Sequence, residues 1–287
     1  MLKSLKESLI APMLFMMALV TLALPAAAAP YATDWIDGHN SRTRLIVGGR
    51  PADDGKVERF VALEIALAPG WKTYWRQPGS AGGIPPHVTW QKSTNLKKVE
   101  VEFPAPRRFV DPSGETIGYK NSVTFPLRVV LDDTDRPLGL RLEVFYGVCR
   151  EICIPVQAAF EVAVSPELFR QTPPELAAAL AKVPVKVKAS IAPALSAVRK
   201  VERAGGAVVL EFDVRYPGTT ADADLFAETG DGQPLEMSKL VARPGKHLVR
   251  FEVPVADATE WRQLGKSGLR LTIVGESGAS EASVPRP

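Results

Sequence analysis

The feature that most constrains this chain is a pair of cysteines, Cys149 and Cys153, the only two in 287 residues. In a straight strand their Cα atoms would lie about 13 Å apart, whereas a disulfide needs roughly 4.4 to 6.8 Å. For the two thiols to bond, the chain must reverse at residues 150–152. The flanking residues are apolar, β-branched or aromatic, which favours strands. We therefore predict an antiparallel hairpin in which the two cysteines face each other.

The ring that such a disulfide would close is small, and this bears on its purpose. In the loop-entropy model a ring of about five residues stabilises the fold by only ~2 kcal/mol, against ~4.7 kcal/mol for a ring of a hundred. The turn also has no glycine to supply a positive φ, so we expect strain, which makes a disulfide easier to reduce. These points favour a redox-active pair over a static disulfide.

A metal-binding pair is the third interpretation of the two cysteines. The chain has three histidines, and none is at ligand spacing from the cysteines. We therefore expect no metal and no cofactor. The three histidines are His39, His87 and His247, and we interpret His87 as structural.

The first 28 residues have the pattern of a secretory signal peptide. A basic head is followed by an apolar run at 9–24 and a small-residue tail that ends in Ala28-Ala29-Pro30. The run is short for a membrane anchor, which is the alternative. No later segment approaches 18 continuous apolar residues. We expect cleavage after Ala28 and a mature protein in the periplasm, an oxidising compartment.

The charge of the chain is nearly balanced, with 35 basic and 32 acidic residues and a formal net charge of +3. There is no run of five or more Lys or Arg residues. Nucleic-acid binding is therefore not expected.

Apolar and polar residues alternate with period two through most of residues 31–164, with turn residues between the runs. This pattern predicts a β-sandwich without helical periodicity. Residues 165–184 differ, because Ser165 and Thr172 precede prolines and acids in the manner of two capped short helices. Strand patterns return over 185–287. The fold class is therefore all-β, with two sandwich domains joined by a short helical linker.

Three blocks of the first domain carry a joint signal. The blocks are Gly70-Trp71-Lys72-Thr73-Tyr74-Trp75-Arg76-Gln77-Pro78-Gly79, then Pro112-Ser113-Gly114-Glu115-Thr116-Ile117-Gly118-Tyr119, and Tyr146-Gly147-Val148-Cys149-Arg150-Glu151-Ile152-Cys153-Ile154-Pro155. In this order they resemble the N-terminal periplasmic domain of the DsbD and ScsB thiol:disulfide reductases. Any one block would be a weak signal, but together they span most of that domain. The second domain resembles the additional immunoglobulin-like domain of ScsB-type members.

The resemblance implies an immunoglobulin-like fold and a site made of few residues. Cys149 and Cys153 match the redox pair, Tyr74 and Trp75 match the aromatic stretch beside it, and the segment from Phe109 through Asp111 to Glu115 matches the capping loop. Tyr146 is expected to join these residues at the docking rim. For Tyr74 and Trp75, ordinary packing in the core or at the rim of the sandwich is the alternative. Two departures are a shorter cysteine spacing than in DsbD, shared with ScsB, and Asp111-Pro112-Ser113-Gly114 in place of aromatic residues in the cap.

In that family the pair takes electrons from a membrane-embedded partner domain and passes them to oxidised periplasmic proteins. This sequence ends at Pro287 without the transmembrane and thioredoxin-like parts. The first hypothesis is therefore a stand-alone electron carrier between an integral membrane reductase of DsbD or CcdA type and oxidised periplasmic proteins. Its substrates could serve disulfide isomerisation, cytochrome c biogenesis or metal-stress defence. The second hypothesis is a non-catalytic binding or scaffold protein with a structural disulfide.

The neighbours of the cysteines bear on which thiol attacks. Arg150, next to Cys149, would favour its thiolate, whereas Glu151 would disfavour it. On Arg150 we predict that Cys149 is the attacking thiol. The domain over 185–287 has no cysteine, and we expect it to take no part in the chemistry.

Overall fold

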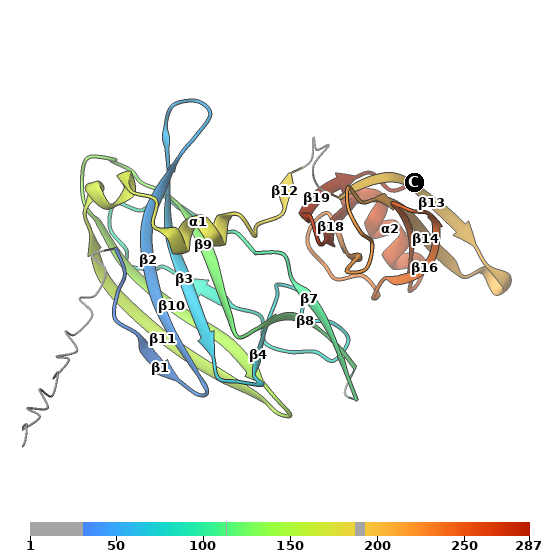
Figure 1. Ribbon diagram of the computed structural model, residues 1–287, viewed down its shortest axis with the longest axis horizontal. Coiled ribbons are helices and arrows are strands. Elements are labelled where there is room, and N and C mark those ends of the chain that lie inside the picture. The colour runs from blue at the N-terminus through green and yellow to red at the C-terminus, as the bar shows by residue number, and fades with distance from the viewer. Residues whose placement is uncertain (1–30, 113, 187–192) are drawn as a thin grey trace, which may run out of the picture.

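A computed structural model describes residues 31–112, 114–186 and 193–287 (Figure 1). The predicted signal peptide lies outside these residues. Strands form four sheets, arranged as two pairs, so the predicted all-β architecture of two sandwiches is confirmed. No helix in the described part of the chain is long and apolar enough to cross a membrane.

The first sandwich stacks a five-stranded sheet on a six-stranded sheet. The five-stranded sheet has the order β1 (Ile36–Gly38), β2 (Ser41–Pro51), β3 (Val57–Leu67), β9 (Ser122–Val130) and β6 (Lys98–Val101). The six-stranded sheet has the order β11 (Cys153–Val164), β10 (Leu138–Cys149), β4 (Lys72–Tyr74), β8 (Gly114–Lys120) and β7 (Arg107–Asp111), with β5 (His87–Thr89) paired to β10.

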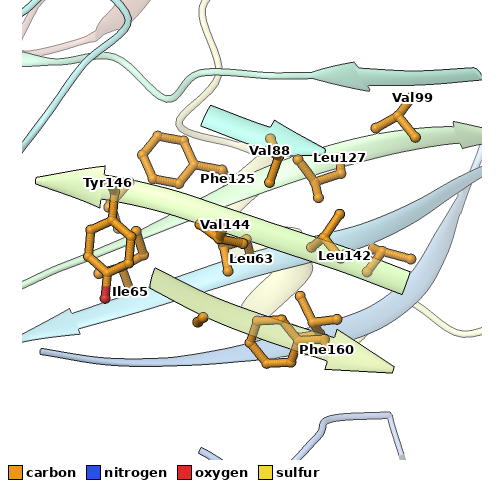
Figure 2. Packing of buried hydrophobic residues seen from close by; sticks show 14 of the residues in the cluster. Leu63, Ile65, Val88, Val99, Phe125, Leu127, Leu142, Val144, Tyr146 and Phe160 are labelled. Atoms are coloured by element: carbon orange, nitrogen blue, oxygen red, sulfur yellow. The ribbon is translucent and has the colours of Figure 1, made fainter. Parts of the chain in front are cut away.

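The core of this sandwich follows from strand alternation. Along β10 the even-numbered residues are buried, while the odd-numbered ones from Arg141 to Phe145 are exposed, because successive side chains of a strand point to opposite faces. Figure 2 shows Leu142, Val144 and Tyr146 of β10 packed with residues of β3 and β9, such as Leu63 and Phe125. The outward face of β10 is thus left for the odd-numbered positions, among them Cys149.

The linker consists of a 3₁₀-helix, η1 (Pro166–Arg170), and the helix α1 (Pro174–Leu180). Both begin with the predicted proline, but neither has a side-chain cap. The Thr172 hydroxyl instead donates a hydrogen bond to the Gly49 carbonyl at 2.6 Å. Leu176 and Leu180 of α1 pack on the outer side of the five-stranded sheet, across which α1 lies in Figure 1. The linker is therefore attached to the first sandwich.

The second sandwich has two four-stranded sheets and a core of its own. One sheet has the order β12 (Val185–Lys186), β19 (Gly278–Val284), β18 (Leu269–Gly275) and β15 (Asp224–Thr229). The other has the order β13 (Ala194–Glu202), β14 (Val208–Arg215), β17 (Leu248–Val255) and β16 (Lys239–Gly245). A short 3₁₀-helix, η2 (Ala204–Gly206), joins β13 to β14. The helix α2 (Ala258–Ser267) was not predicted; the Asp257 side chain caps it by accepting from the amides of Thr259 and Glu260.

The two sandwiches meet through charged and aromatic side chains. Glu228 of β15, fully buried, accepts hydrogen bonds from Arg76 at 2.6 Å and from Arg270 at 2.8 Å. Phe226 of the same strand packs against Trp75, with ring centroids 5.5 Å apart, and joins the core cluster of the first sandwich. The second domain therefore shares core and buried charge with the first.

Candidate functional site

The two cysteines end the strands of one hairpin, as predicted. β10 and β11 pair antiparallel over their whole length, and Cys149 is the direct partner of Cys153. Directly opposed residues of an antiparallel pair have Cα atoms about 4.5 to 5.5 Å apart, which is within the range a disulfide needs. Both residues are partly exposed. The backbone thus holds them where an S–S bond can form and break without a change of register.

The turn between the cysteines differs from the prediction in one respect. None of residues 150–152, all of which the structure describes, has a positive φ, so the expected backbone strain is not found. The Arg150 side chain lies near Gly70, which precedes β4. Its Nε is 4.0 Å from the position that a Cβ on Gly70 would take. Ile152 is 74 % exposed at the tip.

The strand next to the hairpin is β4, whose Lys72 is the direct partner of Cys149. Cross-strand partners lie on the same face of a sheet. Lys72 and, two residues on, Tyr74 therefore share the outer face with the cysteines, while Trp75 belongs to the other face. Lys72 is only 5 % exposed, and its Nζ donates to Asp111 Oδ2 at 2.7 Å and to Thr116 Oγ1 at 3.0 Å.

Tyr74 is the predicted aromatic residue that the structure brings to the sulfurs. Burial raises the pKa of its hydroxyl well above the ordinary value, and hydrogen bonding to Cys153 and Cys149 raises the pKa further. The phenol therefore stays protonated at working pH and can donate a hydrogen bond to a thiolate, an interaction that favours the charged form of the sulfur.

Glycines let the backbone close over the Tyr74 ring. A Cβ on Gly83 would lie 2.2 Å from Tyr74 Cε1, and a Cβ on Gly147 would lie 3.0 Å from Tyr74 Cε2 and 3.1 Å from Cys153 Sγ. The Gly147 amide donates to the Ile84 carbonyl at 2.9 Å. The segment with Gly83 and Ile84 thus forms a roof over the aromatic ring.

The predicted capping loop is the end of a hairpin formed by β7 and β8. The register pairs Phe109 with Thr116 and Asp111 with Gly114, and alternation puts Phe109 and Asp111 on the cysteine face. Glu115 falls on the opposite face, where its carboxylate accepts from Arg108 Nη1 at 2.9 Å. The structure therefore brings Asp111 and Phe109 toward the site and directs Glu115 away from it.

Two other predicted rim residues lie in the core. Trp75 is 1 % exposed and packs against Phe226 of the second domain. Tyr146 is fully buried on the inner face of β10, and its hydroxyl lies 2.8 Å from Ser41 Oγ; Figure 2 shows its ring within the packed side chains. Neither side chain has exposed surface that a docking partner could contact.

Sequence reasoning missed four residues of the site: Lys72, Gly83, Ile84 and Gly147. Lys72 stood unremarked in an aromatic run, since its importance depends on the pairing of β4 with β10. The two glycines are needed because the backbone approaches Tyr74 too closely for a residue with a Cβ. The sequence alone does not show which glycines have this role. Within the described residues, no cluster of three or more His, Cys, Asp or Glu side chains could hold a metal ion.

Comparison with known proteins adds to this geometry. The model of the family "Thiol:disulfide interchange protein DsbD, N-terminal" matches residues 53–165. The fold is similar to the crystal structure of the N-terminal periplasmic domain of ScsB from Proteus mirabilis, with a TM-score of 0.62 and 21 % identity over 90 % of this chain and 99 % of that chain. No curated protein sequence matches. The cysteine hairpin lies at the end of the matched segment, so the family match and the geometry of the site concern the same part of the chain.

Proposed function

We propose that this protein is a periplasmic thiol:disulfide exchange module. In this role it takes electrons from an integral membrane reductase of DsbD or CcdA type and passes them to oxidised periplasmic proteins. The observation that supports it most is the direct cross-strand pairing of Cys149 with Cys153 beside the protonated Tyr74 hydroxyl. The match of residues 53–165 to the model of the DsbD N-terminal family supports the same role.

The exchange consists of two displacements at sulfur. The Cys149 thiolate attacks one sulfur of the partner's disulfide, so that a mixed disulfide forms and the partner's other sulfur leaves as a thiolate, which takes up a proton. The Cys153 thiolate then attacks Cys149 Sγ and releases the partner's second thiol. The partner gains two electrons and two protons, and this chain is left with a Cys149–Cys153 disulfide.

The membrane reductase restores the dithiol by the reverse sequence of steps, with its own dithiol as electron donor. This donor is required because an oxidising compartment offers no thiol pool for the purpose. We propose the hairpin end of the first domain as its docking surface. Ile152, 74 % exposed, is an apolar residue at the tip of the β10–β11 hairpin, and Figure 1 shows the β7–β8 hairpin ending on the same side of the first domain.

A redox titration of the full chain tests the exchange role. We expect a midpoint potential above about −300 mV, the region of labile and catalytic pairs. A midpoint well below that value would mark a structural disulfide and support a scaffold protein instead.

Trapping with single Cys→Ser variants assigns the two thiols. Mixed disulfides with an oxidised partner are expected to accumulate in C153S, because Cys149 attacks and no second thiol resolves the adduct. Adducts in C149S alone would give the attacking role to Cys153.

A further inference from the structure

The search for a further function leads to a buried cation beside the cysteines. Lys72 is 5 % exposed and is the cross-strand partner of Cys149. A lysine is almost never this deeply buried without a partner, and here the partner is a carboxylate of the cap hairpin, Asp111, at 2.7 Å. The same ammonium donates to Thr116 of that hairpin at 3.0 Å. Lys72 thus links the cap to the strand that lies beside Cys149.

The charged groups around Cys149 come from every element packed against it. β4 contributes Lys72, and the turn contributes Arg150, which lies along Gly70, and the exposed Glu151. Residues 79–86, which include the roof over the Tyr74 ring, contain no charged residue. Other groups on this face that can bear charge are Asp111 and Arg107 of β7, Lys120 of β8, the Tyr74 phenol and the Cys153 thiol.

Lys72 differs from these cations in burial and in its contact with the cap. Lys120 is next along the same row of the sheet, but it is exposed and its Nζ lies over the Phe109 ring at 4.5 Å. Charges that are buried interact more strongly than charges in water. While the Asp111 carboxylate is in contact with the Lys72 ammonium, its negative charge offsets the positive charge that Cys149 would otherwise experience.

We propose that Lys72 is a positioning residue that holds the cap hairpin through Asp111 and, once the cap is displaced, turns its ammonium to the thiolate of Cys149. This inference rests on the exchange function proposed above. A docking partner that displaces the cap separates Asp111 from Lys72, which frees the ammonium to turn from β7 and β8 toward Cys149, the cross-strand partner of Lys72. The thiol then loses its proton to solvent more readily, since a nearby cation favours the thiolate. Docking and activation of the sulfur are thereby linked.

The experiment measures iodoacetamide alkylation of Cys149 against pH in the full chain, reduced and carrying C153S so that one thiol remains. The readout is the pH midpoint of the rate. We expect K72M to raise this midpoint by about one unit, the size of a nearby-charge effect, and D111N to lower it. K72R, which keeps the charge, is expected to retain the parent midpoint. In the double variant K72M/D111N the effect of D111N is expected to shrink.

The opposite signs distinguish this role from a purely structural one. If Lys72 and Asp111 only fastened the hairpin, both variants would speed alkylation at every pH and leave the midpoint in place, and the proposal would be overturned. K120M is the matched control, with a smaller shift expected from an exposed lysine. If K72M does not fold, D111N decides, because an unchanged or raised midpoint contradicts the proposal. The titration is independent of any partner, so its failure would leave the exchange function to be judged by the redox midpoint.

Discussion

The hairpin of β7 and β8, called here the cap hairpin, is held in different ways at its two ends. At one end Arg76, just after β4, and Arg108 of β7 bind carboxylates of the second domain, Glu228 at 2.6 Å and Asp224 at 2.7 Å. At the other end Lys72 of β4 binds Asp111 of β7 at 2.7 Å. The contacts are equally short, but their surroundings differ.

Burial of the carboxylate separates the two ends. The Glu228 side chain is fully buried between Arg76 and Arg270, whereas the Asp111 side chain is 35 % exposed. Removal of one partner from a buried ion network costs about 3 to 5 kcal/mol, while water replaces an exposed partner at a lower cost. We therefore expect the interdomain end to stay closed, and the cysteine end to open more easily because its carboxylate is partly exposed, although its lysine is buried. From this contrast we infer that the second domain, which has no cysteine, holds the base of the cap hairpin.

The largest effect is expected at the interdomain end. Glu228→Ala leaves Arg76 and Arg270 without their shared carboxylate, and the free energy of unfolding should fall by about 3 to 5 kcal/mol in urea denaturation. The control is R141A, which removes the pair of Arg141 with Glu161, where the side chains are 51 % and 72 % exposed; its cost should stay below about 1 kcal/mol. Equal losses in the two variants would break the comparison.

An intermediate effect is expected over the sulfurs. In Gly147→Ala the added Cβ would meet Ile84 Cβ at 2.9 Å and Cys153 Sγ at 3.1 Å, so the roof must shift, at a cost of about 1 to 3 kcal/mol. Alkylation of Cys153 should become faster as the cover moves. The matched variant is Gly218→Ala, where no atom lies within 4 Å of an added Cβ and neither stability nor alkylation should change. A G147A protein with unaltered alkylation would show that the roof does not limit access.

The smallest effect is expected on the surface of the turn. Ile152→Asp places a charge where we expect an apolar contact with the membrane partner, and the exchange rate should fall about five- to tenfold, which corresponds to about 1 kcal/mol. Stability should remain within about 0.5 kcal/mol, as for most surface changes. V130D is the control, since Val130 is also exposed, at 42 %, but belongs to β9 of the other sheet. Equal slowing in both variants would remove the turn from the docking surface.

Local patterns were enough to predict the hairpin of Cys149 and Cys153. Its strands alternate with period two, and in a straight strand three intervening residues would hold the thiols too far apart to bond. The two short linker helices were also predicted, because each opens with a proline and an acid. The helix α2 was missed, although the sequence from Asp257 to Glu260 has the spacing of a helix N-terminus; it is a single helix among strands.

The residues around the sulfurs were predicted less well, because their positions depend on how the strands pair. The sequence places Tyr74 next to Trp75, but alternation sends one to the cysteine face and the other into the contact with Phe226. In the same way Asp111 faces the site and Glu115 faces Arg108. Which face is outward depends on register, and a shift of one residue would exchange them.

The cysteines, their spacing and the alternation of β10 and β11 were sufficient to specify a redox-capable hairpin on an all-β fold. The environment of that hairpin came from contacts between segments distant in the chain. Lys72 lies beside Cys149 because β4 pairs with β10, and it meets Asp111, 39 positions away, because β7 pairs with β8 and β8 with β4. Spacing along a strand constrains only the nearest residues, whereas the electrostatic surroundings of a sulfur are built across the sheet, where packing of the whole core selects the partners.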